Sequence, residues 1–168
     1  AGPSSIGLTG NLPDFASMTS LTGLYLYRNA FTGHIPSTFL DGVTSTEQIT
    51  VDLRINNLNG SIPSELSRFT NLNIFLADNE IDSIPSQLCN LTWNGAIVGS
   101  CNNILCAQKT FNSMGRATAN LTCEPCDNTE YAKFYGSTQC IPVPEKEILD
   151  DMFIQLNGQD WTSSDGWR

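Results

Sequence analysis

The sequence predicts a solenoid of short strands, followed by a small disulfide-rich module and a C-terminal amphipathic helix. Three observations carry this prediction: a segment that recurs every 22 to 27 residues, six cysteines confined to the second half, and an apolar stripe at helical spacing near the end. We expect about four coils over residues 1-100, a cysteine-rich module over 101-141, and a cap-like helix with a tryptophan-containing tail over 142-168.

Each predicted coil contains a strand, an asparagine and a turn that ends in proline. Alternating apolar residues such as Leu24 and Leu26 predict a short strand with one apolar side. The turn segment occurs as Leu8–Pro13, Phe31–Pro36, Leu58–Pro63 and Ile81–Pro85, and the asparagines after the strands are Asn29, Asn56 and Asn79. We expect each asparagine amide to bond backbone groups of the neighbouring coil, which would otherwise lack partners.

This pattern resembles the plant-type leucine-rich repeat, LxxLxLxxNxLxGxIPxxL, from residue 6 to about residue 91. The resemblance implies a right-handed β/α superhelix with a short parallel sheet on its concave face, and binding or scaffolding rather than catalysis. Two departures are local: an insertion of three residues around 40–48 enlarges the third coil, and the fourth coil lacks the turn glycine and is shorter.

The cysteines and sequons indicate an oxidising compartment. Only Cys123 and Cys126 are close in sequence, whereas tetrahedral zinc usually takes two close ligand pairs, so disulfides are favoured over a zinc site or a redox-active pair. N-glycosylation sequons begin at Asn59, Asn90 and Asn120, and we expect Asn59 to be the most accessible because it precedes a turn glycine. We therefore expect a secreted glycoprotein of the cell surface or extracellular matrix.

The segment from Cys106 to Cys140 is similar to small cysteine-rich modules of extracellular receptors, of the CxxGTFxxxGxAxxxxxCxxC…GxxxC kind, with Lys109 in place of the first glycine. Six cysteines allow about 15 connectivities. The resemblance implies the pairs Cys89–Cys101, Cys106–Cys123 and Cys126–Cys140.

Composition argues against several classes of partner. The formal net charge is −9, and asparagine, serine and threonine number 16 each. Nucleic acids and anionic membranes select basic surfaces, so we expect neither as a partner. No apolar run approaches the length of a membrane span, so we expect no membrane insertion.

No combination of residues indicates catalysis. His34 lies in the variable position of a turn and has no fixed acidic or hydroxyl partner in sequence, so we interpret it as a surface residue. The chain has no nucleophile elbow, phosphate loop or zinc-protease helix, and Asp160 and Asp165 lack the spaced oxygen ligands of a calcium loop. We expect a protein that is not an enzyme and that uses no cofactor or metal.

The outward positions of the predicted strands form a candidate binding face. They are Tyr25, Tyr27, Arg28, Asp52, Arg54, Asn73 and Phe75. Tyrosine and arginine are enriched at protein interfaces, although single exposed aromatic residues also occur on ordinary strand surfaces.

The last 24 residues, 145–168, combine a helix signal with a second resemblance. One helical face holds Ile148, Leu149, Met152, Phe153 and Leu156. The following segment, with Trp161 and Trp167 in the pattern NGxxWxxxxGW, resembles the N-terminal cap of plant and algal leucine-rich repeat proteins, yet it stands at the opposite end of the chain.

Two functions follow as hypotheses. In the first, the tail covers Ile6, Leu8 and Leu12 of another copy, so that units join head to tail into a fibre or cell-surface array. The next unit could instead belong to the same polypeptide, or the tail could pack on its own cysteine-rich module. In the second hypothesis, the chain is the recognition module of a receptor-like or defence protein, and its concave face binds a peptide or glycan.

Overall fold

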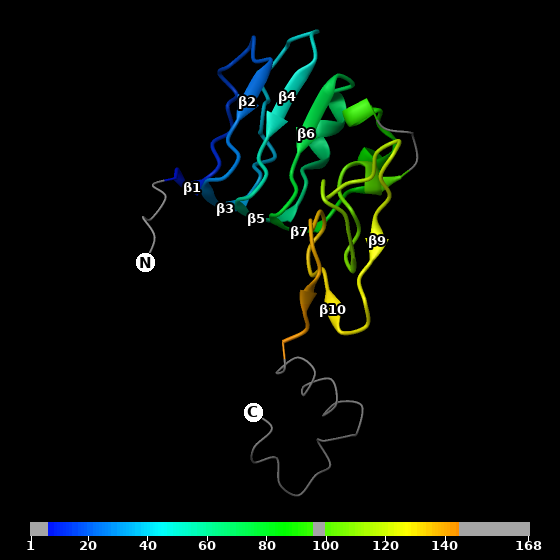
Figure 1. Cartoon of the computed structure of the whole chain (residues 1–168). Helices are drawn as coiled ribbons and strands as arrows, with labels where there is room; N and C mark the ends of the chain where they lie inside the picture. Colours follow the sequence, from blue (N-terminus) through cyan, green and yellow to red (C-terminus); the bar gives the residue numbers. More distant parts are fainter. Residues whose placement is uncertain (1–6, 96–99, 145–168) are drawn as a thin grey trace, which may run out of the picture.

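The structure is a computed structural model that describes residues 7–95 and 100–144. The predicted C-terminal helix and the tryptophans of the tail lie outside the described residues, as does Ile6. The described part is a solenoid of parallel strands followed by a disulfide-rich module, which is the architecture that the sequence predicts (Figure 1).

Three successive coils contribute one strand each to a sheet on the concave face. The strands of this sheet, in the order β2-β4-β6, are β2 (Gly23–Tyr25), β4 (Ile49–Asp52) and β6 (Leu72–Phe75). They are parallel, and the register sets Leu24 beside Val51 and Val51 beside Ile74. Equivalent positions of successive coils therefore stack in columns, with the apolar column buried.

A second parallel sheet runs along the turn segments, where the sequence predicts only tight bends. Its strands, in the order β1-β3-β5-β7, are β1 (Thr9–Asn11), β3 (Ala30–His34), β5 (Asn57–Ser61) and β7 (Glu80–Ser83). The stacked copies bond one another across coils, although three of the four, β1, β3 and β5, contain a glycine with positive φ. At Gly60 (φ 74°) a Cβ would lie 2.2 Å from Nδ1 of His34, so both the backbone angle and the close approach require glycine there.

The ladder between β5 and β7 is irregular. Between the asparagine and the proline, the fourth coil (Asn79 to Pro85) is one residue shorter than the third (Asn56 to Pro63). The register shifts between Gly60 and Ser61, where β7 passes from Ile81 to Ser83 and so holds one extra residue, Asp82.

The insertion in the third coil is part of the core. Phe39, Leu40 and Val43 are all buried, and the Phe39 ring meets that of Phe15 edge-on at 5.9 Å between centroids. The backbone N–H of Leu40 donates to the carbonyl of Asp14 over 2.7 Å, which joins the insertion to the preceding coil.

The chain returns on the convex side through short 3-10 helices. Helix η1 (Ser64–Arg68) and helix η2 (Ser86–Asn90) each follow the proline of an Ile-Pro step. Leu66 and Leu88 are buried, so each helix closes its coil with an apolar side chain.

The open edge of β6 is covered by the next segment of the chain. Helix η3 (Trp93–Gly95) brings the Asn94 side chain to this edge, where its Oδ1 accepts from the N–H of Ile74 over 2.8 Å. The fully buried Trp93 donates from Nε1 to the carbonyl of Phe69 over 2.7 Å. These contacts replace the partners that a further coil would supply.

The cysteine-rich module packs on the last coil. It contains helix η4 (Cys101–Asn103) and two antiparallel pairs, β8 (Thr110–Phe111) with β9 (Glu124–Pro125) and β10 (Glu130–Tyr131) with β11 (Ile141–Pro142). Its disulfides are Cys89–Cys101, Cys106–Cys123 and Cys126–Cys140, the pairing implied by the resemblance.

Backbone bonds join this module to the last coil. The N–H of Tyr135 donates to the carbonyl of Ile81 over 2.9 Å, and the N–H of Asp78 donates to Gly136 over 3.1 Å. Both oxygens of the Asp78 carboxylate accept from the hydroxyl of Thr138, and one also accepts from its N–H over 3.0 Å.

Candidate functional site

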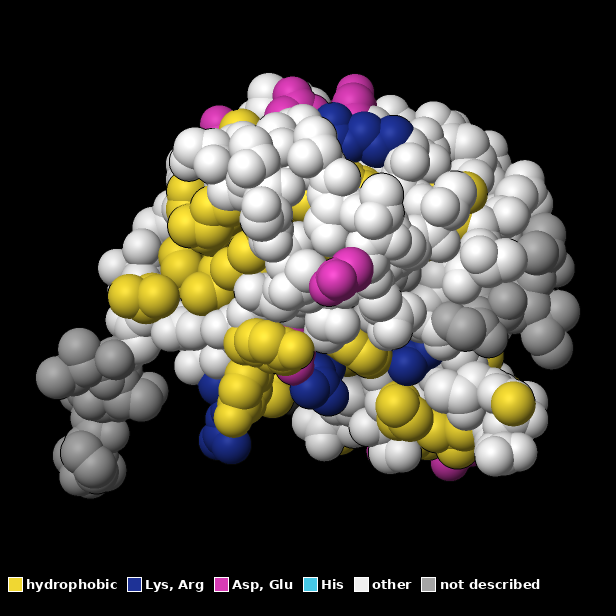
Figure 2. All heavy atoms as spheres, turned by 90° about the horizontal axis from the view of Figure 1, so that it is seen from above, with side chains coloured by type: hydrophobic (Ala, Val, Ile, Leu, Met, Phe, Trp, Pro, Cys, Tyr) yellow, Lys and Arg dark blue, Asp and Glu magenta, His cyan; other side chains and the backbone are white. Residues whose placement is uncertain are grey.

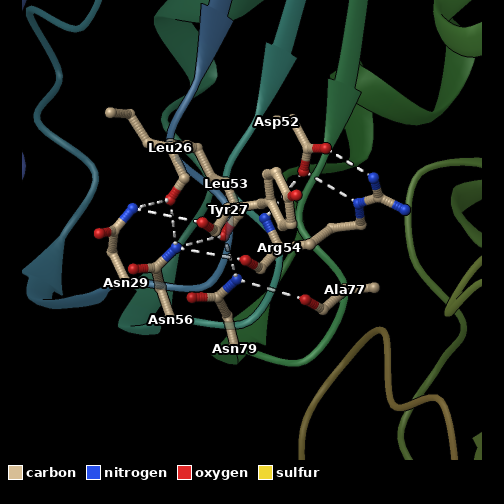
Figure 3. Close-up of polar contacts among 9 residues, drawn as sticks. All are labelled: Leu26, Tyr27, Asn29, Asp52, Leu53, Arg54, Asn56, Ala77 and Asn79. Carbon is tan, nitrogen blue, oxygen red and sulfur yellow. Dashed lines mark hydrogen bonds and ion pairs between the residues drawn. The ribbon is translucent and has the colours of Figure 1, made fainter. Parts of the chain in front are cut away.

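A ladder of asparagines fixes the ends of the concave strands (Figure 3). Asn56 donates from Nδ2 to the carbonyl of Leu53 in its own coil over 2.9 Å and to that of Leu26 in the preceding coil over 3.0 Å. Its Oδ1 accepts from the N–H of Phe31 over 3.1 Å. Asn79 makes the equivalent bonds one coil further, and the bonding between coils confirms the role predicted for these amides.

The residue before each ladder asparagine bends the backbone. Arg28, Ile55 and Asp78 have φ of 56°, 56° and 55°, a left-handed conformation that β-branched residues such as isoleucine rarely adopt. Since the three residues occupy equivalent places in successive coils, they form a row at the end of the concave sheet.

The predicted binding face is present, but its members differ in accessibility. The register sets Tyr25 beside Asp52 and Asp52 beside Phe75. Tyr25 and Tyr27 are 66% and 53% exposed, whereas Asp52 is 6% exposed. Arg28 and Arg54 are exposed, and Asn73 and Phe75 are half-buried. Asp52 is therefore not an accessible contact residue, contrary to the sequence prediction.

Arg54 neutralises the buried Asp52 carboxylate. Its Nε and a terminal nitrogen donate to the two carboxylate oxygens over 2.9 and 2.6 Å, as Figure 3 shows. This hydrogen bonding raises the pKa of Arg54 above its ordinary value. Asp52 is the last residue of β4 and Arg54 follows two residues later. The Asp52 carboxylate therefore fixes the orientation of the Arg54 side chain on the concave face.

A second arginine reaches the same place from the cysteine-rich module. The Cζ atoms of Arg54 and Arg116 lie 5.4 and 5.0 Å from the centroid of the Phe75 ring. Burial lowers the pKa of Arg116, and the positive charge of Arg54 lowers it further. The sequence patterns singled out neither Arg116 nor its meeting with Phe75, because a contact between two modules leaves no periodic signal.

A hollow of about 350 Å³ lies between the strand ends and this module. Tyr27, Arg54 and Ile55 line it on the solenoid side, and Ser113 and Met114 line it on the module side. Figure 2 shows how sparse charged groups are on the face it displays, where neutral side chains and backbone dominate. The hollow itself combines arginine, tyrosine and exposed apolar side chains.

The described residues offer little for metal or redox chemistry. Within ranges 7–95 and 100–144, no group of three His, Cys, Asp or Glu side chains could hold a metal ion. Cys123 and Cys126 are each bonded to a different cysteine, so they do not form a redox pair with one another. His34 is exposed on β3, and its Nδ1 lies 3.2 Å from the carbonyl oxygen of Asn59.

The order of accessibility among the three sequon asparagines differs from the prediction. Asn90 and Asn120 are exposed, whereas Asn59 is half-buried. The reason is the second sheet: Asn59 lies in β5, paired with His34 on one side and Glu80 on the other, rather than in a free turn.

Two residues expected at a subunit interface lie within the described ranges. Leu8 is 57% exposed. Leu12 is 3% exposed and belongs to the core of its own solenoid, so it is not available to a second copy. The other expected interface residues are outside the described part of the chain.

Comparisons with known proteins support the repeat. The family model described as Leucine Rich Repeat matches residues 20–41, which hold β2 and β3. The comparison with curated proteins finds no match. No helix in the described ranges is long and apolar enough to cross a membrane.

Proposed function

We propose that this leucine-rich repeat solenoid is a non-catalytic extracellular recognition module that binds a peptide on its concave face, next to the cysteine-rich module. The observation that carries the proposal is the pair of exposed tyrosines on one face of the sheet: Tyr25 lies beside Asp52, and Tyr27 lines the hollow together with Arg54. Tyrosine and arginine supply large contact area and directional hydrogen bonds, and they dominate binding energy at many interfaces.

Rigidity supports the proposal further. The asparagine ladder and the Asp52–Arg54 pair fix the strand ends before any ligand arrives. A preorganised face loses little conformational entropy on binding. Three disulfides favour an oxidising, extracellular setting for the module.

A displayed library of short random peptides, selected on the intact disulfide-bonded protein, tests this function. We expect enriched peptides whose affinity falls at least about tenfold in the variant Tyr25→Ala/Tyr27→Ala, a loss typical of interface tyrosines. Met18→Ala is the matched control, since Met18 is an exposed apolar residue before β2 and does not line the hollow. Two results would contradict the proposal: enriched peptides whose affinity is unchanged in the tyrosine variant, or affinity losses that are equal in the tyrosine variant and in Met18→Ala.

A second candidate function is head-to-tail assembly into a fibre or array. The observation that favours it is the exposed Leu8 beside β1, which lies at the edge of its sheet as β2 does in the other. Sheet edges with exposed apolar residues are sites where another chain or coil pairs. The tail that would cover this edge lies outside the described residues.

Electron microscopy and size-exclusion chromatography of the full chain test assembly. If the tail joins neighbouring copies, Trp161→Ala/Trp167→Ala abolishes the polymer, because these rings would be buried at the joint. Ser163→Ala/Ser164→Ala alters the same segment without removing apolar area and should leave assembly intact. A wild-type chain that stays monomeric at high concentration excludes this function.

A further inference from the structure

We propose that Ile55 and Met114 hold one apolar side chain of the bound peptide in the hollow where the solenoid meets the cysteine-rich module, and that Ile55 serves binding rather than the stability of the fold. The inference rests on the proposed function and deepens it by stating the chemistry of the ligand and the residues that select it. It also gives the cysteine-rich module a direct part in recognition.

Ile55 is unfavourable for the fold in two ways. Its φ of 56° is a left-handed conformation that strains a β-branched side chain and that glycine or asparagine adopts more readily. Its side chain is 47% exposed, so burial offsets little of this strain. An isoleucine that suits neither the backbone nor the core is a candidate for a role in binding.

The backbone angle at Ile55 is imposed by the stacking of the coils. The N–H of Ile55 donates to the carbonyl of Ala77 in the next coil over 3.0 Å, and Asn56, which follows, is fixed by the ladder. Arg28 and Asp78, at the equivalent places of the neighbouring coils, have nearly the same φ. The angle therefore belongs to the whole row, whereas an apolar side chain at this place belongs to the coil of Ile55.

Met114 lines the hollow from the cysteine-rich module. Its side chain is 43% exposed, and its N–H donates to the buried side chain of Asn112 over 2.9 Å. The next residue, Gly115, leaves no room for a Cβ beside Ala77, so the backbone next to Met114 lies against the solenoid. A flexible methionine on a fixed backbone, across from Ile55, can adapt to apolar side chains of different shape.

Charge indicates what stands next to the apolar residue in the peptide. The charged residues that line the hollow are Arg28, Arg54 and Asp78, an excess of one positive charge in a chain whose net charge is −9. Both carboxylate oxygens of Asp78 already accept from Thr138. Arg54 gives Nε and one terminal nitrogen to Asp52 and directs its other terminal nitrogen away from it (Figure 3). The hollow therefore favours an acidic residue over a basic one beside the apolar side chain.

The polar groups around the apolar pair favour a peptide over a lipid. Besides Ile55 and Met114, the lining includes the hydroxyl side chains of Ser113 and Thr138. A peptide brings backbone N–H and C=O groups that can bond such polar groups, whereas an acyl chain would remove them from water without replacing their partners. A volume of about 350 Å³ holds one side chain with its adjoining backbone. Tyr27, which lines the same hollow, connects it to the concave face.

The first test uses the peptides selected from the display library. We expect enriched peptides to share a Leu, Ile, Met or Phe next to an Asp or Glu. Replacing that apolar residue by alanine in a synthetic copy should weaken binding to the wild-type protein about tenfold, a loss typical of one buried aliphatic side chain. Met114→Ala should weaken binding of the original peptide to a similar extent and should discriminate less between the two peptides.

Ile141→Ala is the matched control for this test. Ile141 is an apolar residue of the same module with the same exposure, 43%, and it does not line this hollow. The variant should keep both the affinity and the discrimination of the wild-type protein.

The second test separates binding from folding through the variant Ile55→Asn. Because asparagine tolerates the left-handed conformation, the change should increase the folding equilibrium constant about fivefold in urea denaturation, while it weakens peptide binding about tenfold. Lys109→Asn is the control for strain, since Lys109 has φ of 65°, is exposed and does not line the hollow. It should raise stability and leave peptide affinity unchanged.

Three other results would overturn the inference. If Ile55→Asn and Met114→Ala keep full affinity for peptides that depend on Tyr25 and Tyr27, the hollow is not the pocket, and the proposed function stands. If Ile55→Asn lowers the folding equilibrium constant, Ile55 serves the fold. If no peptide depends on the tyrosines, on Ile55 or on Met114, the inference and the proposed function are both wrong.

Discussion

At the scale of single residues, the ladder asparagines do more for the fold than their polar character suggests. Asn56 is buried and serves two coils at once, because it bonds backbone groups of Leu26 and Phe31 in the preceding coil and of Leu53 in its own. Asn29 is half-buried and bonds Leu8 in the same way at an exposed position. The cost of losing an asparagine should therefore depend on its place in the ladder rather than on its chemistry.

We predict that Asn56→Ala lowers the free energy of unfolding by about 2 to 3 kcal/mol, because it leaves the buried N–H of Phe31 without a partner and removes one of the two side-chain bonds to the carbonyl of Leu53, which keeps its bond from Asn79. Asn29→Ala, the matched change one coil earlier, should cost about 1 kcal/mol, because water can replace the bond to Leu8. Urea denaturation of both variants measures the difference. Equal losses of unfolding free energy in the two variants would show that the burial of Asn56 does not add to its contribution.

Sequon use is also set residue by residue. Asn90 and Asn120 are exposed, and Asn59 is half-buried between neighbouring strands. We predict that protein from a eukaryotic secretory host carries glycan at Asn90 and Asn120 and little or none at Asn59. Peptide mapping with and without a glycosidase reports the occupancy of each site. Full occupancy of Asn59 would show that glycan is attached before β5 is paired.

At the scale of elements, the repeat could be predicted because every coil carries its own signals. The apolar alternation of β4, the asparagine after it and the Ile-Pro step at Pro63 all indicate the same structure locally. The second sheet could not be predicted, since β3 and β5 become strands only when two turn segments are stacked. For the same reason the sequence gives no indication that Asn94 and Trp93 close the edge of β6, or that Arg116 meets Phe75.

We predict that Trp93→Phe costs about 1 to 2 kcal/mol of unfolding free energy, because the carbonyl of Phe69 loses its donor while the apolar contact largely remains. Trp93→Ala should cost about 3 to 5 kcal/mol, since it also leaves a cavity. In both variants, amide hydrogen exchange should become faster first at Ile74, the edge residue whose N–H donates to the Asn94 side chain. If exchange at Ile74 is unchanged in both variants, η3 does not protect this edge.

At the scale of the whole molecule, the solenoid and the cysteine-rich module act as one rigid support. Gly115 and Gly136 approach Ala77 so closely that a Cβ on Gly115 would lie 2.5 Å from the Ala77 Cβ. The Asp78–Thr138 bonds and the Cys89–Cys101 disulfide tie the two parts at separate points. The hollow between them keeps its shape only while this contact holds.

We predict that Thr138→Val, which preserves side-chain shape but removes the hydroxyl, weakens this contact by about 1.5 to 3 kcal/mol, the range for hydrogen bonds to charged groups. Hydrogen exchange should then increase at Tyr135 and Gly136 before it increases in the solenoid strands. Thr129→Val changes an exposed threonine near β10 and should have little effect. Unchanged protection at Gly136 would show that the Thr138 hydroxyl does not contribute to this contact.

The asparagine ladder also has a direction. Asn29, Asn56 and Asn79 accept from Leu8, Phe31 and Leu58, so every asparagine completes the coil that precedes it in the chain. A coil that has just left the ribosome therefore still lacks a partner and gains it only when the next strand and its asparagine have been synthesised. The coils then gain their hydrogen-bond partners in the order in which they are translated, because each new coil bonds the one before it. Trp93 and Asn94 supply the corresponding bonds to the last coil.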